Sequence, residues 1–207
     1  MLPVNEHDIF ASLGLYLKKG FLDASLCEKI IAQMEEQPSE AGYLITSDKG
    51  DVIDTGLRSA RLSDIPIDYA YMIRDGLEEL KPLLEDYFDL RLDSQEKPQF
   101  LLYEPGGHYA PHRDVPSEEF ENRVRIQSRL VSIVIFLNDR AGDHPYSGGE
   151  LTFYELVSDP QWKDYGLPLE PETGLLVAFR SDTLHEVRPV TEGKRFTVAN
   201  WFHSHFS

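Results

Sequence analysis

The chain has 207 residues, of which 41% are hydrophobic and 11% aromatic, and its formal net charge is -16. This composition is sufficient for a packed core and excludes an intrinsically disordered chain. The acidic charge would repel nucleic-acid phosphates, and the apolar runs, such as residues 130–137, are too short to cross a bilayer. We therefore expect neither a nucleic acid nor a membrane as a partner.

The N-terminal residues 1–8 are polar and lack the basic start and apolar stretch of a secretory signal. Cys27 is the single cysteine and cannot form an internal disulfide. Both features favour the reducing cytoplasm as the compartment. The sequence leaves the oligomeric state open between a monomer and a homodimer, which an exposed edge near the N-terminal strands could form.

Two helices are predicted in the N-terminal half. Residues 23–36 form the first, with Asp23 or Ser25 as its cap, Ser25 and Glu28 as a capping box, and one apolar face. Residues 67–90 form the second, after Pro66, and Pro82 should kink or split it. Its predicted apolar face consists of Met72, Ile73, Leu77, Leu80, Leu83, Leu84 and Phe88.

From residue 99 onward the sequence pattern changes to short runs that are rich in β-forming residues. Predicted strands cover residues 100–103, 129–137, 150–154, 174–179, 185–190 and 195–202. Turns rich in Gly and Pro separate them, which is typical of a sandwich or barrel. Earlier runs at residues 14–21 and 43–46 could add edge strands.

We therefore predict a mainly β fold with flanking helices, of the α+β class, as a single domain over residues 1–207. Residues 1–98 supply helices and edge strands that pack on the core, and residues 99–207 form the core that carries the site. Two long connections, residues 115–127 and 156–170, are candidates for lids or substrate-contact loops, and a tolerated surface excursion is an equal alternative for each.

His112, Asp114 and His185 are the candidate metal ligands. In an extended segment His112 and Asp114 point to the same side, while Arg113 points away. Two imidazoles and one carboxylate suit Fe(II) and leave coordination positions open. Zinc on the same three residues would suit a hydrolytic site, but no acid is clearly placed as a general base.

Arg195 lies on the strand after His185 and shares a strand face with Thr197. A guanidinium fork and a hydroxyl together can hold a carboxylate in a dry pocket. The alternative is a surface cation at the start of a strand. If Arg195 is buried near the metal ligands, it indicates an acidic cosubstrate held on the metal.

These residues lie in ordered segments that resemble prolyl 4-hydroxylase-like Fe(II)/2-oxoglutarate dioxygenases. LYEPGGHYAPHRD at residues 102–114 is similar to the family segment Y-x-P-G-x-x-(Y/F)-x-x-H-x-D. RLVSIVIFLN at 129–138, SGGELTFY at 147–154, GLLVAFRSDTLHEVRPV at 174–190 and KRFTVANW at 194–201 resemble the segments that follow it. The resemblance covers about half of the chain, from residue 99 to residue 202.

The resemblance implies a double-stranded β-helix (jelly-roll) core and Fe(II) on His112, Asp114 and His185. It also implies 2-oxoglutarate anchored by Arg195, with Tyr103 and Thr197 in the cosubstrate pocket, O2 as the oxidant, and ascorbate as a reductant. The implied reaction is hydroxylation of an unactivated C–H bond, with succinate and CO2 as coproducts. Because related halogenases lack the carboxylate ligand, its presence favours hydroxylation.

One departure from the family concerns Phe136, which stands where many relatives carry a tyrosine that reaches the cosubstrate. The pocket should therefore depend more on Arg195, Thr197 and Tyr103. Other polar residues are weaker candidates. His108, Tyr109 and Trp201 could line a pocket or fill the core, and Arg58 and Arg61 could bind an acidic substrate or form ion pairs. His144 fits an exposed loop. His203 and His205 form a weak candidate for a second metal site.

The sequence does not select the substrate. A prolyl residue in a protein or peptide, a free amino acid and a small natural product remain open, because a fold-level analogy cannot choose between them. An open groove would favour a peptide, and a closed pocket under residues 115–127 would favour a small molecule. A non-catalytic jelly roll that senses a metal or ligand is the alternative from another class.

Overall fold

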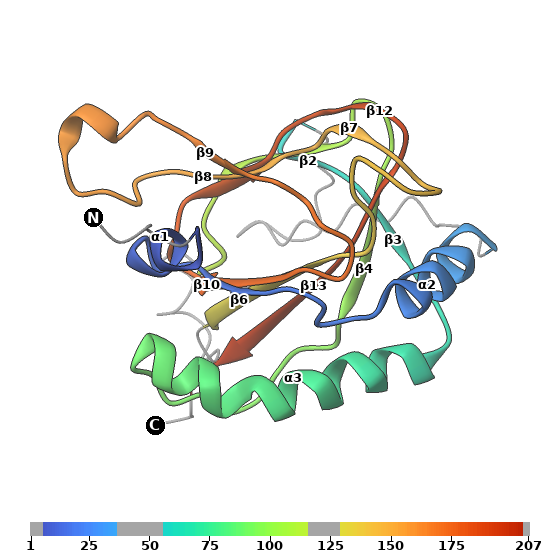
Figure 1. Ribbon diagram of the computed structural model, residues 1–207, viewed down its shortest axis with the longest axis horizontal. Coiled ribbons are helices and arrows are strands. Elements are labelled where there is room, and N and C mark those ends of the chain that lie inside the picture. Colours follow the sequence, from blue (N-terminus) through green and yellow to red (C-terminus); the bar gives the residue numbers. More distant parts are fainter. Residues whose placement is uncertain (1–5, 37–55, 116–128, 205–207) are drawn as a thin grey trace.

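The computed structural model describes residues 6–36, 56–115 and 129–204, and two β-sheets face each other at its centre (Figure 1). The larger sheet has the order β1 (Tyr16–Lys18), β10 (Leu176–Arg180), β6 (Arg129–Phe136), β13 (Arg195–His203), β4 (Gln99–Tyr103) and β3 (Arg61–Ser63). The smaller sheet has the order β2 (Arg58–Ser59), β5 (His108–His112), β11 (His185–Val187), β8 (Leu151–Phe153) and β9 (Leu167–Leu169). A short pair joins β12 (Val190–Glu192) and β7 (Ser147–Gly148).

This arrangement is a double-stranded β-helix, which confirms the predicted fold class. Strands of the larger sheet pair antiparallel although they lie far apart in the chain, as in the pairing of β13 with both β4 and β6. The N-terminal strands β1 and β3 occupy the two edges of this sheet. The expectation of one domain over residues 1–207 stays a prediction, and the sharing of sheets between the two halves supports it.

Alternation along the strands of the larger sheet sends side chains into two separate cores. On β13, Phe196, Val198 and Phe202 face the core beneath the helices, whereas Ala199 and Trp201 face the space between the sheets. The same period places Arg195 and Thr197 between the sheets. The strand pattern therefore delivers a row of polar and aromatic side chains to the interior of the jelly roll.

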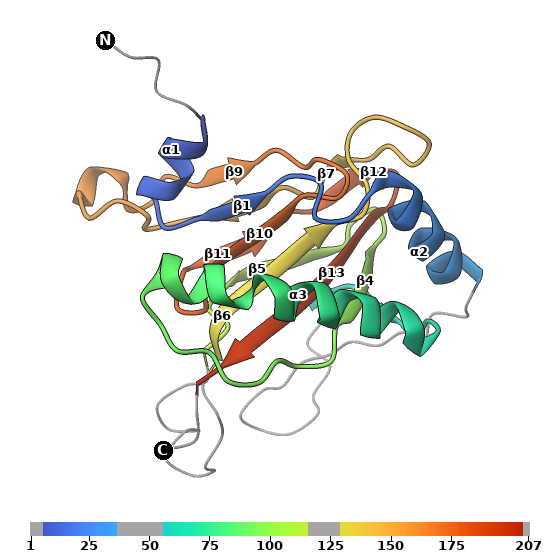
Figure 2. The ribbon, with the colours of Figure 1, turned by 60° about the horizontal axis from the view of Figure 1, so that its bottom comes forward.

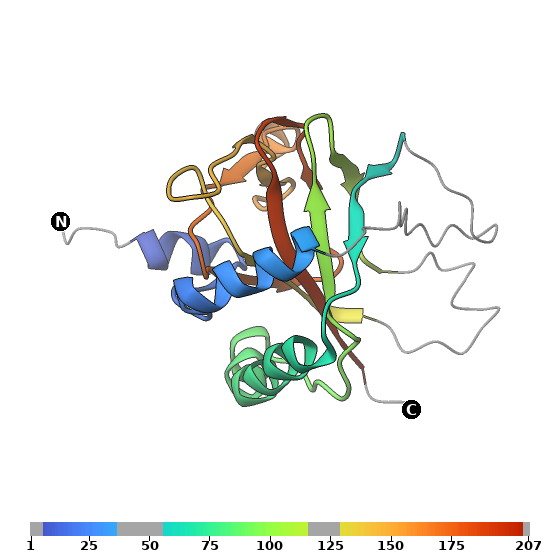
Figure 3. The same ribbon diagram turned by 90° about the vertical axis from the view of Figure 1, so that its right-hand side faces the viewer.

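Helices α2 (Ala24–Glu36) and α3 (Ile67–Phe88) cover the outer face of the larger sheet (Figures 2 and 3). The amide of Leu26 donates to the Asp23 carboxylate at 2.8 Å, so Asp23 caps α2. This confirms one of the two predicted caps, and because α2 begins at Ala24, the alternative cap Ser25 lies inside the helix. The short helix α1 (Glu6–Ser12) was not predicted.

Helix α3 corrects two predictions about its apolar face. Met72 and Leu83 are 54% and 56% exposed, because they lie beside the stripe that faces the sheet. The stripe itself consists of Ala70, Ile73, Leu77, Leu80, Leu84 and Phe88. Pro82 does not split the helix: it lies on the exposed side, and the buried residues on either side of it hold both halves on the sheet.

The neighbouring residues Leu83 and Leu84 provide a matched test of this packing. We expect Leu84→Ala to lower the free energy of unfolding by about 2–5 kcal/mol, because it leaves a cavity in the buried stripe. Leu83→Ala should change it by no more than about 0.5 kcal/mol, because that side chain faces solvent. Urea denaturation followed by circular dichroism measures both, and equal effects would contradict the assigned helix face.

All six strands predicted after residue 99 are present, with ends shifted by one or two residues in most, but residues 185–190 divide into β11 and β12. Pro189, which has no amide hydrogen, lies at the break. Residues 14–21 contain the predicted edge strand as β1, whereas residues 43–46 lie outside the described residues. The predicted loop at 156–170 contains the short helix η1 (Pro160–Trp162) and β9, and the loop at 115–127 lies outside the described residues apart from Val115.

None of the helices in the described ranges combines the length and the apolar character that crossing a membrane requires.

Candidate metal centre and cosubstrate pocket

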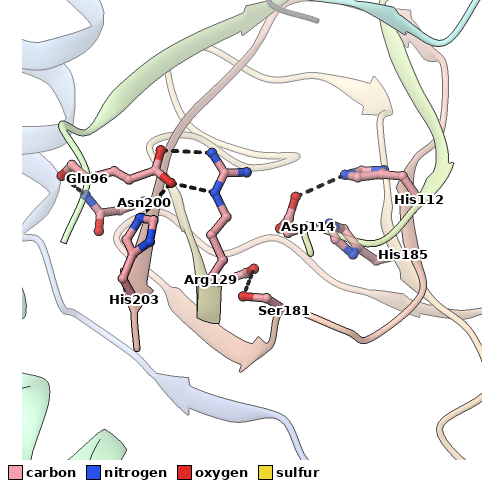
Figure 4. Close-up of polar contacts among 9 residues, drawn as sticks. Glu96, His112, Asp114, Arg129, Ser181, His185, Asn200 and His203 are labelled. Carbon is pink, nitrogen blue, oxygen red and sulfur yellow. Dashed lines mark hydrogen bonds and ion pairs between the residues drawn. The ribbon is translucent and has the colours of Figure 1, made fainter. Parts of the chain in front are cut away.

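The three candidate metal ligands meet at one end of the smaller sheet. His112 ends β5, Asp114 lies two residues further on, and His185 begins β11. Because β5 and β11 pair antiparallel with His112 opposite His185, residues distant in the chain become neighbours. The Asp114 carboxylate lies 3.5 Å from Nε2 of His112 and 3.6 Å from Nε2 of His185 (Figure 4). The three ligand atoms lie within 4.8 Å of one another, so one ion could contact all three.

Backbone hydrogen bonds fix the orientation of both imidazoles. Nδ1 of His112 lies 2.9 Å from the carbonyl oxygen of Ala110, and Nδ1 of His185 lies 2.9 Å from that of Thr183. A carbonyl accepts only, so each Nδ1 carries the hydrogen and donates it. In the neutral rings each Nε2 then keeps its lone pair, which is the arrangement that a metal ligand requires.

The electrostatics of the three residues also suit a cation. Burial lowers the pKa of His185 to about 4, so this ring is neutral at physiological pH. Burial alone would raise the pKa of Asp114, but the adjacent imidazoles of His185 and His112 hold it well below its ordinary value. The group therefore presents a neutral nitrogen donor from His185 and a negative oxygen donor from Asp114.

Arg195 is a cation buried between the two sheets. Its side chain is 1% exposed, and Nη1 donates to the Thr197 hydroxyl at 3.2 Å. Within the described residues, its Nε and Nη2 make no hydrogen bond and no carboxylate forms an ion pair with it. Unpaired buried charges are costly, so this guanidinium fits a site that receives an anion from outside the chain. The donor set of the pocket thus fits a dicarboxylate cosubstrate.

Tyr103 and Phe136 form the aromatic surroundings of this guanidinium. The Arg195 carbon Cζ lies 5.0 Å from the Tyr103 ring centroid and 5.3 Å from that of Phe136. Phe136 contributes a ring face but no hydroxyl, as the sequence departure suggested. Gly149 allows the close approach of the neighbouring turn, because a Cβ there would lie 3.0 Å from Cδ of Arg195.

Tyr146, which was not among the predicted site residues, lies beside Arg195. Its side chain is 3% exposed; burial raises the pKa of its hydroxyl, and the charge of Arg195 partly opposes that shift. No periodic pattern could have identified it, because it lies outside the strands, just before β7.

A cavity of about 140 Å³ connects the three candidate ligands with Arg195. The other residues around it include Arg58, Gln99, Tyr109, Arg129 and Trp201. Tyr109 stacks on His112 with ring centroids 3.4 Å apart. The Arg58 guanidinium lies over the Tyr109 ring, with Cζ 4.8 Å from the ring centroid. Arg129 was not singled out in the sequence, because one arginine before an apolar strand gives no signal of its own.

The remaining candidates lie away from the cavity. Arg61 forms a surface ion pair with Glu104 at 3.1 Å, and His108 bonds the carbonyl oxygens of Gly106 and Gly56. His144 is partly exposed. His203 pairs with Glu96 at 3.0 Å, and His205 lies outside the described residues. Within the described part of the chain, His112, Asp114 and His185 are the one group that could hold a metal.

Fold and site together define a jelly-roll protein with a three-residue group able to hold a metal and a buried cation beside it. Residues 98–203, more than half of the chain, match the 2OG-Fe(II) oxygenase superfamily. The chain belongs to this superfamily of enzymes, and within it the chain is similar to prolyl 4-hydroxylases.

Among curated proteins, the chain is 25% identical to "Probable prolyl 4-hydroxylase 8" of Arabidopsis thaliana over 92% of its own length and 68% of that protein. It spans about two thirds or less of the curated relatives it matches first. Among solved structures, a prolyl-4-hydroxylase of Pseudomonas putida has a TM-score of 0.69 and 25% identity, with 96% of both chains covered. A prolyl hydroxylase of Trichoplax adhaerens, solved with a peptide fragment, has a TM-score of 0.64, with 94% and 86% covered, and its 19% identity supports the fold alone.

Proposed function

We propose that this enzyme hydroxylates an unactivated C–H bond of a prolyl residue in a protein or peptide, with succinate and CO2 as coproducts. The observation that carries the proposal is the convergence of His112, Asp114 and His185 near the buried Arg195, which pairs with no carboxylate among the described residues. Bound Fe(II), 2-oxoglutarate and O2 supply the oxidation when they are present. Ascorbate as a reductant and the cytoplasm as the compartment remain part of this proposal.

The chain's own residues have separable roles in this proposal. His112, Asp114 and His185 would hold Fe(II), and three protein ligands are few enough to allow further ligands to bind. Arg195 and Thr197 bind the distal carboxylate of 2-oxoglutarate, and Tyr103 packs against the guanidinium that holds it. Burial of this pocket excludes bulk water and strengthens the charge contact.

The cavity wall favours a ring-shaped substrate group with a carbonyl oxygen nearby. Tyr109 and Trp201 supply aromatic surface, and Arg129 lies over the Trp201 ring at 3.9 Å. Nε and Nη2 of Arg129 donate to Glu96, at 2.5 and 2.8 Å. Figure 4 shows the third nitrogen turned away from Glu96, on the side where Asp114 lies. We infer that Arg129, held in this way, donates to a carbonyl or carboxylate oxygen of the substrate.

A free amino acid or another small acid is the second candidate substrate. The observation that favours it is the presence of two guanidinium groups, Arg58 and Arg129, around the cavity of a chain with net charge -16. Cations at this position would attract a free carboxylate. Residues 115–127, which we expected to distinguish a groove from a closed pocket, lie outside the described residues apart from Val115. A non-catalytic sensor is the alternative that predicts no turnover at all.

Mass spectrometry of products separates these possibilities. The iron-loaded enzyme is incubated with 2-oxoglutarate and O2, together with proline-containing peptides, free proline or other amino acids. We expect succinate and a product heavier by one oxygen atom with an internal prolyl peptide. Oxygen incorporation only into free acids would replace the proposal by the second candidate. Absence of succinate under every condition, with Fe(II) bound, would favour the sensor.

Glu96 offers a test of the proposed role of Arg129. Burial raises the pKa of Glu96, but hydrogen bonds from His203 and Arg129 outweigh burial and lower it below the ordinary value. We expect Glu96→Gln to raise the KM for the substrate several-fold and to leave the KM for 2-oxoglutarate unchanged. It should also lower the free energy of unfolding at pH 7 by about 1–3 kcal/mol, as for a hydrogen bond to a charged group.

The pH dependence of this stability difference has a defined sign. The pKa of Glu96 is lower in the folded chain than in the unfolded chain, so the folded state binds fewer protons. The stabilisation is present above the ordinary pKa of about 4.3 and is lost as the pH falls below it. Denaturation of the wild type and Glu96→Gln between pH 7 and pH 3 should therefore show a shrinking difference. A difference that is constant across this range would show that the carboxylate does not form the ion pair.

A further inference from the structure

Arg113 stands between two candidate metal ligands in the chain, yet its side chain points away from them and joins two other segments. Its Nη1 donates to the carbonyl oxygen of Asp182, and its Nη2 donates to the carboxylate of Glu155. Asp182 lies in the turn before β11, and Glu155 lies just after β8. One side chain therefore connects the segment that carries Asp114 to the turn that precedes His185.

The turn at residues 181–184 determines where His185 lies. The carbonyl oxygen of Thr183 accepts the hydrogen bond from Nδ1 of His185 at 2.9 Å. The neighbouring carbonyl oxygens of this turn accept from other segments: that of Ser181 from the amide of Asp114 at 2.8 Å, and that of Leu184 from the amide of Tyr154 at 2.9 Å. The Arg113 contact to Asp182 completes this row, in which each carbonyl of the turn is bonded.

Glu155 carries a further sign that this contact is selected over local backbone preference. Its φ is 58°, in the left-handed region, where a residue with a Cβ is strained. Strained backbone persists only where surrounding contacts hold it, and it gathers at functional sites. Among the described residues, Glu155 pairs with two cations, Arg113 and, at 4.0 Å, Lys163.

We propose that Arg113 is a positioning residue that sets metal affinity by tying the Asp114 segment to the turn before His185. This rests on the proposed function, because it assumes that the three ligands share one ion. The Arg113 and Glu155 side chains are 41% and 32% exposed, and ion pairs of this exposure contribute little to global stability. The effect of the contact should therefore fall on the relative placement of the ligands.

Calorimetric titration of the metal-free protein with Mn(II) tests this proposal without turnover. Groups that orient metal ligands typically change metal affinity about 10- to 100-fold. We expect Arg113→Ala to raise the Kd for Mn(II) by about 10-fold, with the melting temperature of the metal-free protein unchanged. Arg113→Lys should lie between, because one ammonium cannot reproduce a fork that reaches both partners. Turnover of Arg113→Ala should recover as Fe(II) approaches saturation.

Arg180→Ala is the matched control. Arg180 approaches the carboxylate of Asp182 at 3.8 Å, and in the described part of the chain it makes no bond to residues 112–115, so its loss should leave the Kd unchanged. If Arg113→Ala does not fold, Glu155→Gln removes the charge of the same contact and should raise the Kd in the same direction. A Kd within twofold of the wild type in the folded variant, or an equal rise in Arg180→Ala, would overturn the proposal. Failure of His185→Ala to weaken Mn(II) binding would instead overturn the metal site itself.

Discussion

His185→Ala should abolish hydroxylation and weaken metal binding by more than about 100-fold. Even groups that only orient a metal ligand change affinity by about 10- to 100-fold, so the loss of a ligand itself should exceed that range. The geometry gives the reason: Nε2 of His185 lies 3.6 Å from the Asp114 carboxylate, and the ring is held with this nitrogen turned inward. Succinate production and Mn(II) calorimetry measure the two effects.

His144→Ala is the matched control for this variant. His144 is partly exposed and lies outside the cavity, and its ring centroid lies 6.2 Å from that of Phe196 in a T-shaped arrangement. Its replacement should leave turnover and Mn(II) affinity within twofold of the wild type. Anaerobic addition of Fe(II) and 2-oxoglutarate should give a visible charge-transfer band in the wild type and in His144→Ala, and none in His185→Ala. Unchanged turnover in His185→Ala would remove this residue from the metal shell.

The sequence predicted the fold class because the β-rich half has local signals that agree with one another. Alternation of apolar and polar residues and Gly-rich turns predicted the strands, and the segments that resemble the family predicted their order along the chain. The helix face was predicted wrongly only at its margins. Met72 and Leu83 are apolar and lie near the buried stripe, but the width of the stripe depends on how α3 packs on the sheet. The same packing keeps α3 continuous through Pro82, which local propensity alone cannot foresee.

The site also contains residues that the sequence predicted and residues that it did not. Ligand chemistry, strand period and family resemblance identified His112, Asp114, His185 and Arg195, and the structure brings all four to one cavity. Site residues from irregular segments or from partner strands were not predicted, because their positions depend on tertiary pairing. Tyr146 lies beside Arg195 in an irregular loop, and Arg113 and Arg129 have no spacing that distinguishes them from surface cations.

Arg195→Met should have opposite effects on the free protein and on cosubstrate binding. In the free protein the guanidinium is buried with two nitrogens unpaired, so an apolar side chain of similar length should raise the free energy of unfolding. Replacing buried charges by apolar groups often stabilises by about 1–4 kcal/mol. Affinity for 2-oxoglutarate should fall about 10²- to 10³-fold, because truncating one partner of a buried charge pair costs about 3–5 kcal/mol.

Thermal denaturation with and without 2-oxoglutarate in the presence of Mn(II) measures both effects in one experiment. The wild type should gain stability as 2-oxoglutarate is added, whereas Arg195→Met should start higher and gain little. Arg195→Lys keeps the charge but loses the fork, so its gain should be intermediate. A structural role for Arg195 predicts instead that Arg195→Met melts lower in every condition and keeps the cosubstrate-dependent shift. The sign of the change in the free protein therefore distinguishes a residue that awaits an anion from one that supports the core.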